Sequence, residues 1–261
     1  MSMITVSEAH ERLHRNNRVR VDDESVDLKD CLGRVLATDV VSSIDVPPAD
    51  NSAMDGYALR RADWIAADHA LEISQRITAG SPPAPLKPGT AARIFTGAET
   101  PEGADVVVMQ EKSRADGGQV YLDAVGNIGA NIRPKGQDIT RGGTVLQKGH
   151  RLRAQDLGLI ASLGIATIEV RRRLKVAIIS TGEELVEPGD PLKPGQIYNS
   201  NRYMLQALVE GWGFEVVDFG ITADDPQIIS GILSEASREA DAIMTTGGVS
   251  VGEEDHVKAV V

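Results

Sequence analysis

The chain has 261 residues, 41% of them hydrophobic and 25% charged, which is typical of globular proteins and predicts two or three domains. Its 38 acidic residues outnumber the 27 basic ones, which argues against a nucleic-acid backbone as the main partner. The single Cys31 excludes an internal disulfide, and the absence of a signal-peptide pattern or of an apolar run near about 18 residues predicts a cytoplasmic protein without a membrane partner.

The first part of the chain predicts two short helices. Thr5 and Glu8 form a capping-box pattern, in which the hydroxyl caps the helix and the carboxylate reaches back to the free amide. A second helix is expected over residues 28–32 and ends at Gly33, which can adopt the left-handed cap conformation. Cys31 lies in this helix as a small core residue, with a catalytic thiol as the alternative.

Residues 34–43 are expected to be extended, and the prolines and small polar residues of 44–56 predict an ordered loop. Beyond this loop, residues 57–136 alternate short β-like runs with glycine and proline turns, which predicts a compact all-β module. The expected strands cover residues 71–78, 91–95, 105–110 and 119–122.

A helix over 155–163, a strand over 166–170 and a solvated junction of three arginines at 171–173 precede a change of pattern. Asp225 and Pro226 then provide an N-cap and a first-turn proline for a helix that runs to residue 238. The other expected elements are strands at 174–180, 214–219 and 241–246 and a helix at 199–210. This β-α-β-α-β order predicts a parallel sheet.

Two glycine-rich, hydroxyl-rich segments, 180–184 and 245–252, follow the first and third of these strands. In an open parallel sheet, ligands bind beyond the carboxyl ends of the strands, and glycines with hydroxyls and free amides suit phosphate. Each segment alone could be a tight turn, but two on neighbouring strands favour a ligand that carries phosphate.

Acidic residues crowd the same edge, where carboxylates beside a phosphate site normally hold Mg²⁺. Stabilisation of acids by helix N-termini is the alternative, and Asp225 is better explained as an N-cap. His256 has no second histidine at metal-ligand spacing, so it is expected to be a surface residue. The acidic residues are Glu183, Glu184, Asp224, Asp225, Glu253, Glu254 and Asp255.

Three polar loops lie earlier in the chain, at 50–57, 95–99 and 131–138. The first could serve a turn or a site. The third places Arg133 and Lys135 near Asp138, which suits an oxyanion that needs cationic donors, or else forms a solvated turn with an ion pair.

Six segments in this order resemble the molybdopterin molybdenumtransferase family, which includes the E domain of gephyrin. They are Asp-Asn-Ser-Ala-Met-Asp-Gly-Tyr-Ala (50–58), Thr-Gly-Ala-Glu-Thr-Pro-Glu-Gly-Ala-Asp-Val-Val-Val (96–108), Asn-Ile-Arg-Pro-Lys-Gly-Gln-Asp-Ile (131–139), Ser-Thr-Gly-Glu-Glu-Leu (180–185), Asn-Ser-Asn (199–201) and Gly-Gly-Val-Ser-Val-Gly-Glu-Glu-Asp (247–255). The resemblance runs from about residue 4 to the end of the chain.

The resemblance implies a multidomain α/β plus β fold. Residues 1–46 and 138–172 would form an extended N-terminal dimerisation domain, 47–137 an inserted β module, and 173–261 a three-layer α/β molybdopterin-binding domain with a parallel sheet. In the family this last domain continues with a further strand and a lysine-bearing Pro-Gly-Lys-Pro segment, and a C-terminal β domain follows. We therefore expect a C-terminally truncated chain.

The resemblance also implies an elongated homodimer whose site lies between the α/β domain of one subunit and the first two domains of the other. Thr181, Gly182, Gly247, Gly248 and Ser250 would bind the pterin or its phosphates. Glu184, Asp224 and Asp255 would place Mg²⁺ and the adenylate. Asp55, Thr96, Arg133 and Asp138 of the partner subunit would close the site and help orient molybdate.

The implied reaction converts adenylyl-molybdopterin and molybdate to molybdenum cofactor and AMP, with a molybdopterin adenylyltransferase as the upstream partner. A non-catalytic molybdopterin-binding or scaffold protein of the same fold, inactive through truncation, is the alternative. A nucleotide hydrolase that shares only the last domain is a third possibility, against which the segments at 50–58 and 131–139 count.

Overall fold

The computed structural model describes residues 4–16, 21–247 and 257–260. The chain divides into two compact units. The first combines Met1–Thr38, Gly149–Leu157 and Ala166–Val261, and the second combines Asp39–Lys148 with Gly158–Ile165. The three-domain boundaries inferred from the resemblance stay a prediction. No helix within the described ranges is long and apolar enough to cross a membrane.

The first unit begins with α1 (Val6–Asn16), and the predicted capping box is confirmed. The Thr5 amide donates to Glu8 Oε2 at 2.8 Å, and the Glu8 amide donates to Thr5 Oγ1 at 3.2 Å. Two helix amides without an intrahelical acceptor are thereby satisfied.

The helix predicted at 28–32 is shorter than expected: η1 (Leu28–Asp30) is a single 3-10 turn. The chain leaves the helix because the amide of Gly33, with φ at +77°, donates to Leu152 O. Cys31 is fully buried, with Sγ 3.2 Å from the Asp27 carbonyl oxygen, and burial raises the pKa of its thiol. These features support its role as a core residue.

The rest of this region is a strand pair and the first part of a helix, whose residues from Gly158 onward belong to the second unit. β1 (Asp23–Asp27) pairs antiparallel with β12 (Thr167–Arg171), and α3 (Ala154–Ser162) ends just before Gly164, whose φ is +75°. The predicted helix at 155–163 and strand at 166–170 are confirmed within one or two residues.

The second unit contains a six-stranded sheet with the order β7-β4-β6-β5-β9-β8. Its strands are β4 (Gly56–Leu59), β5 (Ala70–Ile77), β6 (Thr90–Ile94), β7 (Val106–Met109), β8 (Ser113–Asp116) and β9 (Gln119–Leu122). Neighbours are antiparallel except β5 and β6, which are parallel. All four predicted strands are confirmed, whereas β4, β8, the helix α2 (Arg61–Ala66) and the turn η2 (Gln110–Lys112) were not predicted.

β4 escaped prediction because both of its faces are buried, so it shows no alternation of polar and apolar residues. Tyr57 and Leu59 pack in one apolar cluster with Trp64 of α2, and Ala58 packs in another with Leu86. Gly56 begins the strand where the neighbouring backbone comes closest: a Cβ there would lie 1.9 Å from Val108 O.

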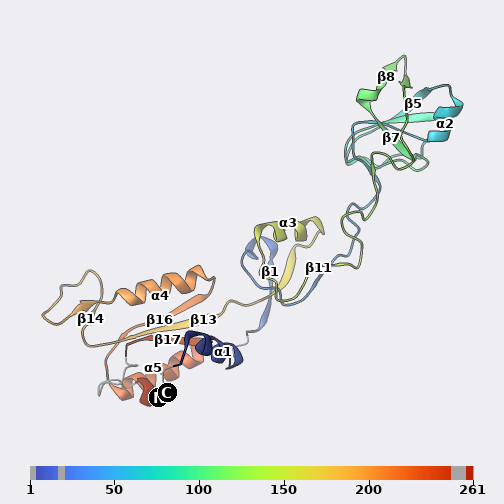
Figure 1. The fold of residues 1–261 in the computed structure, drawn as a ribbon. Helices are drawn as coiled ribbons and strands as arrows, with labels where there is room; N and C mark the ends of the chain where they lie inside the picture. The colour runs from blue at the N-terminus through green and yellow to red at the C-terminus, as the bar shows by residue number, and fades with distance from the viewer. Residues whose placement is uncertain (1–3, 17–20, 248–256, 261) are drawn as a thin grey trace. The chain divides into compact units, whose positions relative to one another are not determined.

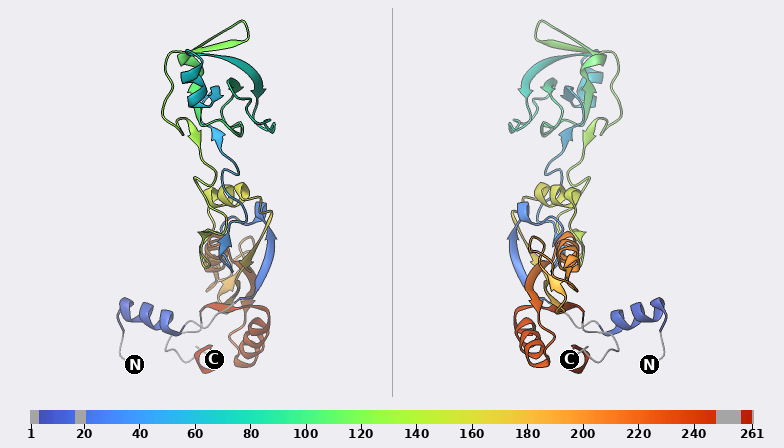
Figure 2. Two further views of the ribbon diagram at one scale, coloured as in Figure 1. Left: turned by 90° about the vertical axis from the view of Figure 1, so that its right-hand side faces the viewer. Right: turned by 90° about the vertical axis from the view of Figure 1, so that its left-hand side faces the viewer.

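Two short strand pairs continue the second unit beyond this sheet (Figure 2). β3 (Asn51–Ser52) pairs with β10 (Ile132–Arg133), and β2 (Val40–Val41) pairs with β11 (Thr144–Leu146), all antiparallel. The predicted loop at 44–56 is therefore ordered as expected, but it includes β3.

The parallel sheet of the first unit is confirmed, with the order β16-β13-β17. Its strands are β13 (Lys175–Thr181), β16 (Glu215–Thr222) and β17 (Ala242–Thr246). Val176 and Ile178 of β13 pack with α4 (Ser200–Gly211), while Ala177 and Ile179 pack with α5 (Pro226–Glu239). Because alternate residues of a strand face opposite ways, the two helices cover opposite faces and make the expected three layers (Figure 1).

Smaller elements complete this unit. They are the parallel pair β14 (Leu185–Val186) and β15 (Ile197–Tyr198) and the short helix α6 (Val257–Val260). Asp225 caps α5 as predicted, since its Oδ1 accepts the amides of Gln227 and Ile228 at 2.8 and 3.0 Å.

The arginine junction at 171–173 is less solvated than expected. Arg172 donates from Nη1 and Nη2 to the two carboxylate oxygens of Asp241, at 2.7 and 2.6 Å, and Asp241 also accepts the Lys175 amide. The hydrogen bonds from Arg172 lower the pKa of Asp241 from 3.8 to about 2. This bidentate ion pair fixes the start of β13 against the start of β17.

Replacing Gly56 by Ala should lower the free energy of unfolding by about 3 kcal/mol, because the new methyl group would collide with backbone that cannot rotate away. Gly158→Ala is the control: its site in α3 is open, so this change should leave stability equal or raise it by up to about 1 kcal/mol. Chemical denaturation measures both. Equal stability of the two variants would contradict the packing of β4 against β7.

The Arg172–Asp241 pair should make stability depend on pH in acid. The pKa of Asp241 is lower in the folded state than its ordinary 3.8, so the ionised carboxylate stabilises the fold above that value and loses this effect as pH falls toward about 2. Wild type should therefore exceed Asp241→Asn in stability at pH 6, with a difference that shrinks below about pH 4. Glu239→Gln, at an exposed site in α5, is the control, and a difference independent of pH for Asp241→Asn would refute the expectation.

Candidate functional sites

In the second unit, three segments far apart in the sequence meet at the backbone of Ser52. Its amide donates to Ala98 O at 2.9 Å and its carbonyl accepts the Gly97 amide at 2.8 Å. On the other side it pairs with Ile132 in the β3–β10 ladder. The segments 50–58, 96–108 and 131–139, which the sequence singled out separately, are therefore neighbours in one cluster.

Asp55 and Thr96 form a direct contact in this cluster. The Thr96 amide and hydroxyl both donate to Asp55 Oδ1, at 2.8 and 2.7 Å. These bonds, backbone first, lower the pKa of Asp55, and the charge of Arg93 acts in the same direction. Asp55 is half-buried and Thr96 is exposed. The carboxylate is thus held ionised with one oxygen occupied, and no described residue donates to the other.

Arg133 and Asp138, predicted to orient an oxyanion, lie on exposed parts of the same unit. Arg133 pairs with Asn51 through the backbone of β10, and the Asp138 amide donates to Val46 O at 2.9 Å. The ion pair in this loop links Lys135 to Asp45 at 3.5 Å rather than to Asp138. Arg133 has no carboxylate within ion-pair distance in the described chain, so its guanidinium remains open to an anion.

In the first unit, the strand ends bring Thr181, Gly182 and Gly247 together. The register pairs Thr181 with Thr222 and Ser180 with Thr246. A Cβ on Gly247 would lie 2.4 Å from Thr181 O, so glycine is required for this close approach. Gly248 and Ser250 lie outside the described residues.

Three hydroxyl groups at this edge have no hydrogen-bond partner among the described residues. They belong to Ser180, Thr181 and Thr222, whose exposed fractions are 0%, 4% and 3%. A buried polar group without a partner costs free energy, so such groups need an explanation, and a bound ligand supplies one. Thr222 was not predicted. The predicted strand ended at residue 219, whereas β16 extends to Thr222, so no sequence signal singled this residue out.

The carboxylates predicted to hold Mg²⁺ are only partly described. Glu184 is exposed and its Oε2 lies 2.5 Å from where a Cβ on Gly182 would stand, so it folds over the end of β13. Asp224 is half-buried just after β16. Asp255 and His256 lie outside the described residues, and residues 4–16, 21–247 and 257–260 contain no group of three or more His, Cys, Asp or Glu suited to a metal.

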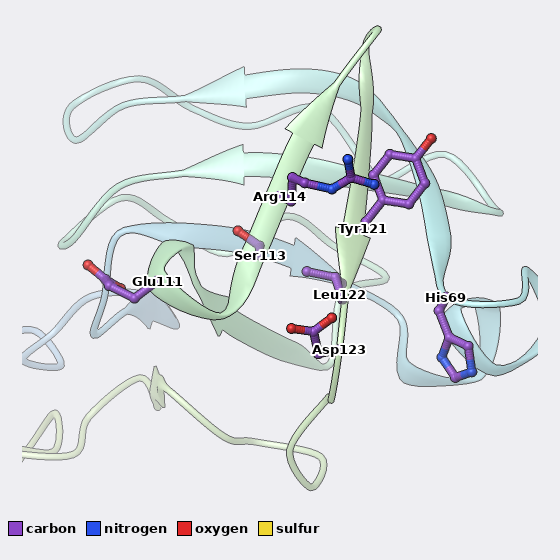
Figure 3. A pocket seen from close by; sticks show the side chains of 7 residues that line it. All are labelled: His69, Glu111, Ser113, Arg114, Tyr121, Leu122 and Asp123. Atoms are coloured by element: carbon purple, nitrogen blue, oxygen red, sulfur yellow. The ribbon is translucent and has the colours of Figure 1, made fainter.

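A separate shallow cavity of about 390 Å³ lies beside the β8–β9 hairpin (Figure 3). The Arg114 guanidinium stacks on the Tyr121 ring at 4.6 Å, and Glu111, Asp123 and His69 line the same hollow. It contains none of the predicted site residues, and its charges are mixed in sign and largely exposed.

Comparison with known proteins gives two family matches that follow one another along the chain. Residues 4–164 match the MoeA N-terminal region (domain I and II), and residues 177–261 match a probable molybdopterin binding domain. A chain with this pair of regions is of the molybdenum cofactor biosynthesis class.

Curated relatives agree with this class. The chain is 40% identical to a molybdopterin molybdenumtransferase of Haemophilus influenzae, over 99% of this chain and 64% of that protein. It is 43% identical to a protein of the same name from Nostoc sp., over 92% of this chain and 56% of that protein. A crystal structure of the molybdopterin biosynthesis moeA protein from Pyrococcus horikoshii OT3 superposes with a TM-score of 0.87 at 36% identity, covering 94% of this chain and 67% of that one.

The chain therefore belongs to the molybdopterin molybdenumtransferase (MoeA) family, as the six sequence segments predicted. It spans less than two thirds of the length of these two curated relatives. The α/β plus β fold class is confirmed by the structural match.

If the hydroxyl of Thr222 is kept for a ligand, its removal should stabilise the unliganded chain. Thr222→Val preserves shape and should raise the free energy of unfolding by about 1 kcal/mol, because an unpaired buried hydroxyl disappears. Thr90→Val is the matched control: its hydroxyl contacts Lys87 O and Ser74 Oγ at 2.8 Å, so its loss should destabilise by about 1–2 kcal/mol. Equal destabilisation in chemical denaturation would show that Thr222 is hydrogen-bonded within the protein.

Proposed function

We propose that this chain supplies a substrate-binding and reacting part of a molybdopterin molybdenumtransferase, which converts adenylyl-molybdopterin and molybdate to molybdenum cofactor and AMP. The observation that carries the proposal is the row of buried hydroxyls, without a partner among the described residues, at the carboxyl edge of the parallel sheet. They are donors placed where α/β proteins bind phosphate-bearing ligands. The names of the curated relatives support the same reaction.

At this edge, Thr181 and Thr222 would donate hydrogen bonds to the pterin or its phosphates, together with Gly182, Gly247, Gly248 and Ser250. The glycines let phosphate oxygens reach backbone amides, since no side chain stands between them. Binding the substrate at a fixed place reduces the entropy cost of bringing it to molybdate.

Glu184 and Asp224, with Asp255, would hold Mg²⁺, because hard cations prefer carboxylate oxygens and the Glu184 carboxylate is exposed. The ion would neutralise charge on the bridging phosphates when the adenylate is cleaved. The carboxylates themselves would fix the orientation of the phosphates relative to the hydroxyls.

Asp55, Thr96, Arg133 and Asp138 would orient molybdate. Arg133 offers a forked cation to an oxyanion, and the free oxygen of Asp55 can accept a proton or a hydrogen bond from a ligand. We propose further that the chain acts in a cytoplasmic homodimer in which these residues face the α/β region of the partner subunit. A molybdopterin adenylyltransferase would supply the substrate. The domains would be 1–46 with 138–172, 47–137, and 173–261.

The test is AMP release from adenylyl-molybdopterin, with Mg²⁺, in the presence and absence of molybdate. Wild type should release AMP only with molybdate, and Asp55→Asn should be about 100-fold slower, because a misplaced reacting group costs this order of magnitude. Asp116→Asn, on the exposed strand β8, is the control and should match wild type.

Two results would count against the proposal. Turnover of Asp55→Asn at the wild-type rate would remove Asp55 from the site. Tight binding of the substrate by wild type without any AMP release would instead make this chain a binding protein.

A further inference from the structure

Arg93, the penultimate residue of β6, contacts the segment that carries Asp55. Its Nη1 donates to Gly56 O at 2.9 Å and its Nη2 donates to Gln110 Oε1 at 2.7 Å. The backbone amide of Gln110 in turn donates to the backbone carbonyl oxygen of Asp55 at 2.9 Å. The carbonyl groups of Asp55 and of the next residue are therefore both fixed, one by Gln110 and the other by Arg93.

The Arg93 guanidinium also stacks on two aromatic rings, one in the segment that carries Thr96 and one in the segment that carries Asp55. Its carbon lies 4.4 Å from the centre of the Phe95 ring and 5.2 Å from that of Tyr57. Phe95 directly precedes Thr96, and Tyr57 follows Asp55 by two residues. One planar cation thus holds both the strand end that carries Thr96 and the loop that carries Asp55, an arrangement for which a guanidinium is suited and an ammonium is not.

The partners of Arg93 are neutral, although the chain has a net charge of −11. No carboxylate of the described residues lies within ion-pair distance of it, and its hydrogen bonds go to carbonyl and amide oxygens. Its charge is therefore not cancelled by direct contact, and it adds to the Thr96 hydrogen bonds in lowering the pKa of Asp55.

We propose that Arg93 is the positioning residue of the Asp55–Thr96 pair. It holds the segments that carry Asp55 and Thr96 so that Thr96 binds one oxygen of the Asp55 carboxylate and the second oxygen of that carboxylate faces the substrate. It touches no reacting atom. The catalytic consequence rests on the proposed function, whereas the positioning itself does not.

Arg76 provides a matched control within the same cluster. Its guanidinium carbon lies 4.6 Å from the Phe95 ring, so it shares the stacking and the charge. It makes no hydrogen bond to the Asp55 segment in the described structure and it is exposed. Arg76→Gln and Arg93→Gln therefore remove the same charge beside the same ring, and only the second removes the hydrogen bonds to the loop.

The experiment is an NMR titration of the Asp55 carboxylate and the Thr96 amide in the full 261-residue chain, with AMP release measured in parallel. In Arg93→Gln the titration midpoint of Asp55 should rise and the Thr96 amide proton should move to the shift of a weaker hydrogen bond. Arg76→Gln should change neither by a comparable amount. AMP release should fall in kcat by about the factor seen for Asp55→Asn, with KM little changed, and the double variant should be no slower than Asp55→Asn alone, because the two residues act as one unit.

Arg93→Lys and Gln110→Ala keep the test decisive if Arg93→Gln does not fold. The lysine retains charge but cannot make both hydrogen bonds, and the alanine removes the Gln110 acceptor, together with its contact to Glu111, while Arg93 stays, so each should shift the Asp55 midpoint in the same direction by less. An unchanged midpoint and an unchanged Thr96 amide in the folded variants would overturn the positioning role. Absence of AMP release by wild type would refute the proposed function while the titration still decides the role of Arg93.

Discussion

The second unit depends on the backbone hydrogen bonds that gather three loops around Ser52. None of these loops has a core of its own, and each adds only one or two side chains, such as Ala98 and Ile132, to the neighbouring apolar clusters. Ser52 is fully buried and its two backbone groups bind the 96–99 turn, while β3 and β10 join it to the third segment. Because unpaired buried backbone groups are costly, these hydrogen bonds hold the three loops in this arrangement, which brings Asp55 and Thr96 together.

This arrangement explains why the segment 50–57 contains two aspartates with different roles. Asp50 accepts a hydrogen bond from the Lys135 amide at its carboxylate and one from the Thr100 amide at its backbone carbonyl, so it links the three loops. Among the described residues, the Asp55 carboxylate accepts hydrogen bonds only from Thr96, and these leave its second oxygen without a donor. Asp50 therefore has a structural explanation in its contacts with both neighbouring loops, whereas Asp55 is the aspartate of this segment that we propose for the site.

The features that the sequence predicted are those that local chemistry determines. The capping box at Thr5, the cap at Asp225 and the apolar run of β13 each depend on neighbours a few residues away. The features that it missed depend on distant contacts: β4 is buried on both faces, β5 and β6 run parallel, and Thr222 lies beside Thr181 only in the sheet. Arg93 was missed for the same reason, since Gly56 and Gln110 become its neighbours only when β4, β6 and β7 pair.

The two sites differ in how their polar groups are satisfied, and the difference fits different tasks. Asp55 and Thr96 bond to each other and to a supported backbone, so they are rigid before any ligand arrives, which suits orientation of a reactant. The hydroxyls of Ser180, Thr181 and Thr222 are buried without a partner among the described residues, which lowers stability but leaves donors for a ligand. Gly182 and Gly247 likewise leave the backbone open to a ligand. A side chain at Gly182 would collide with the Glu184 carboxylate, and one at Gly247 would collide with Thr181. In the roles proposed here, the residues that would bind the ligand leave polar groups unsatisfied, whereas those that would orient the reactant satisfy theirs, as expected when binding and positioning are carried by separate residues.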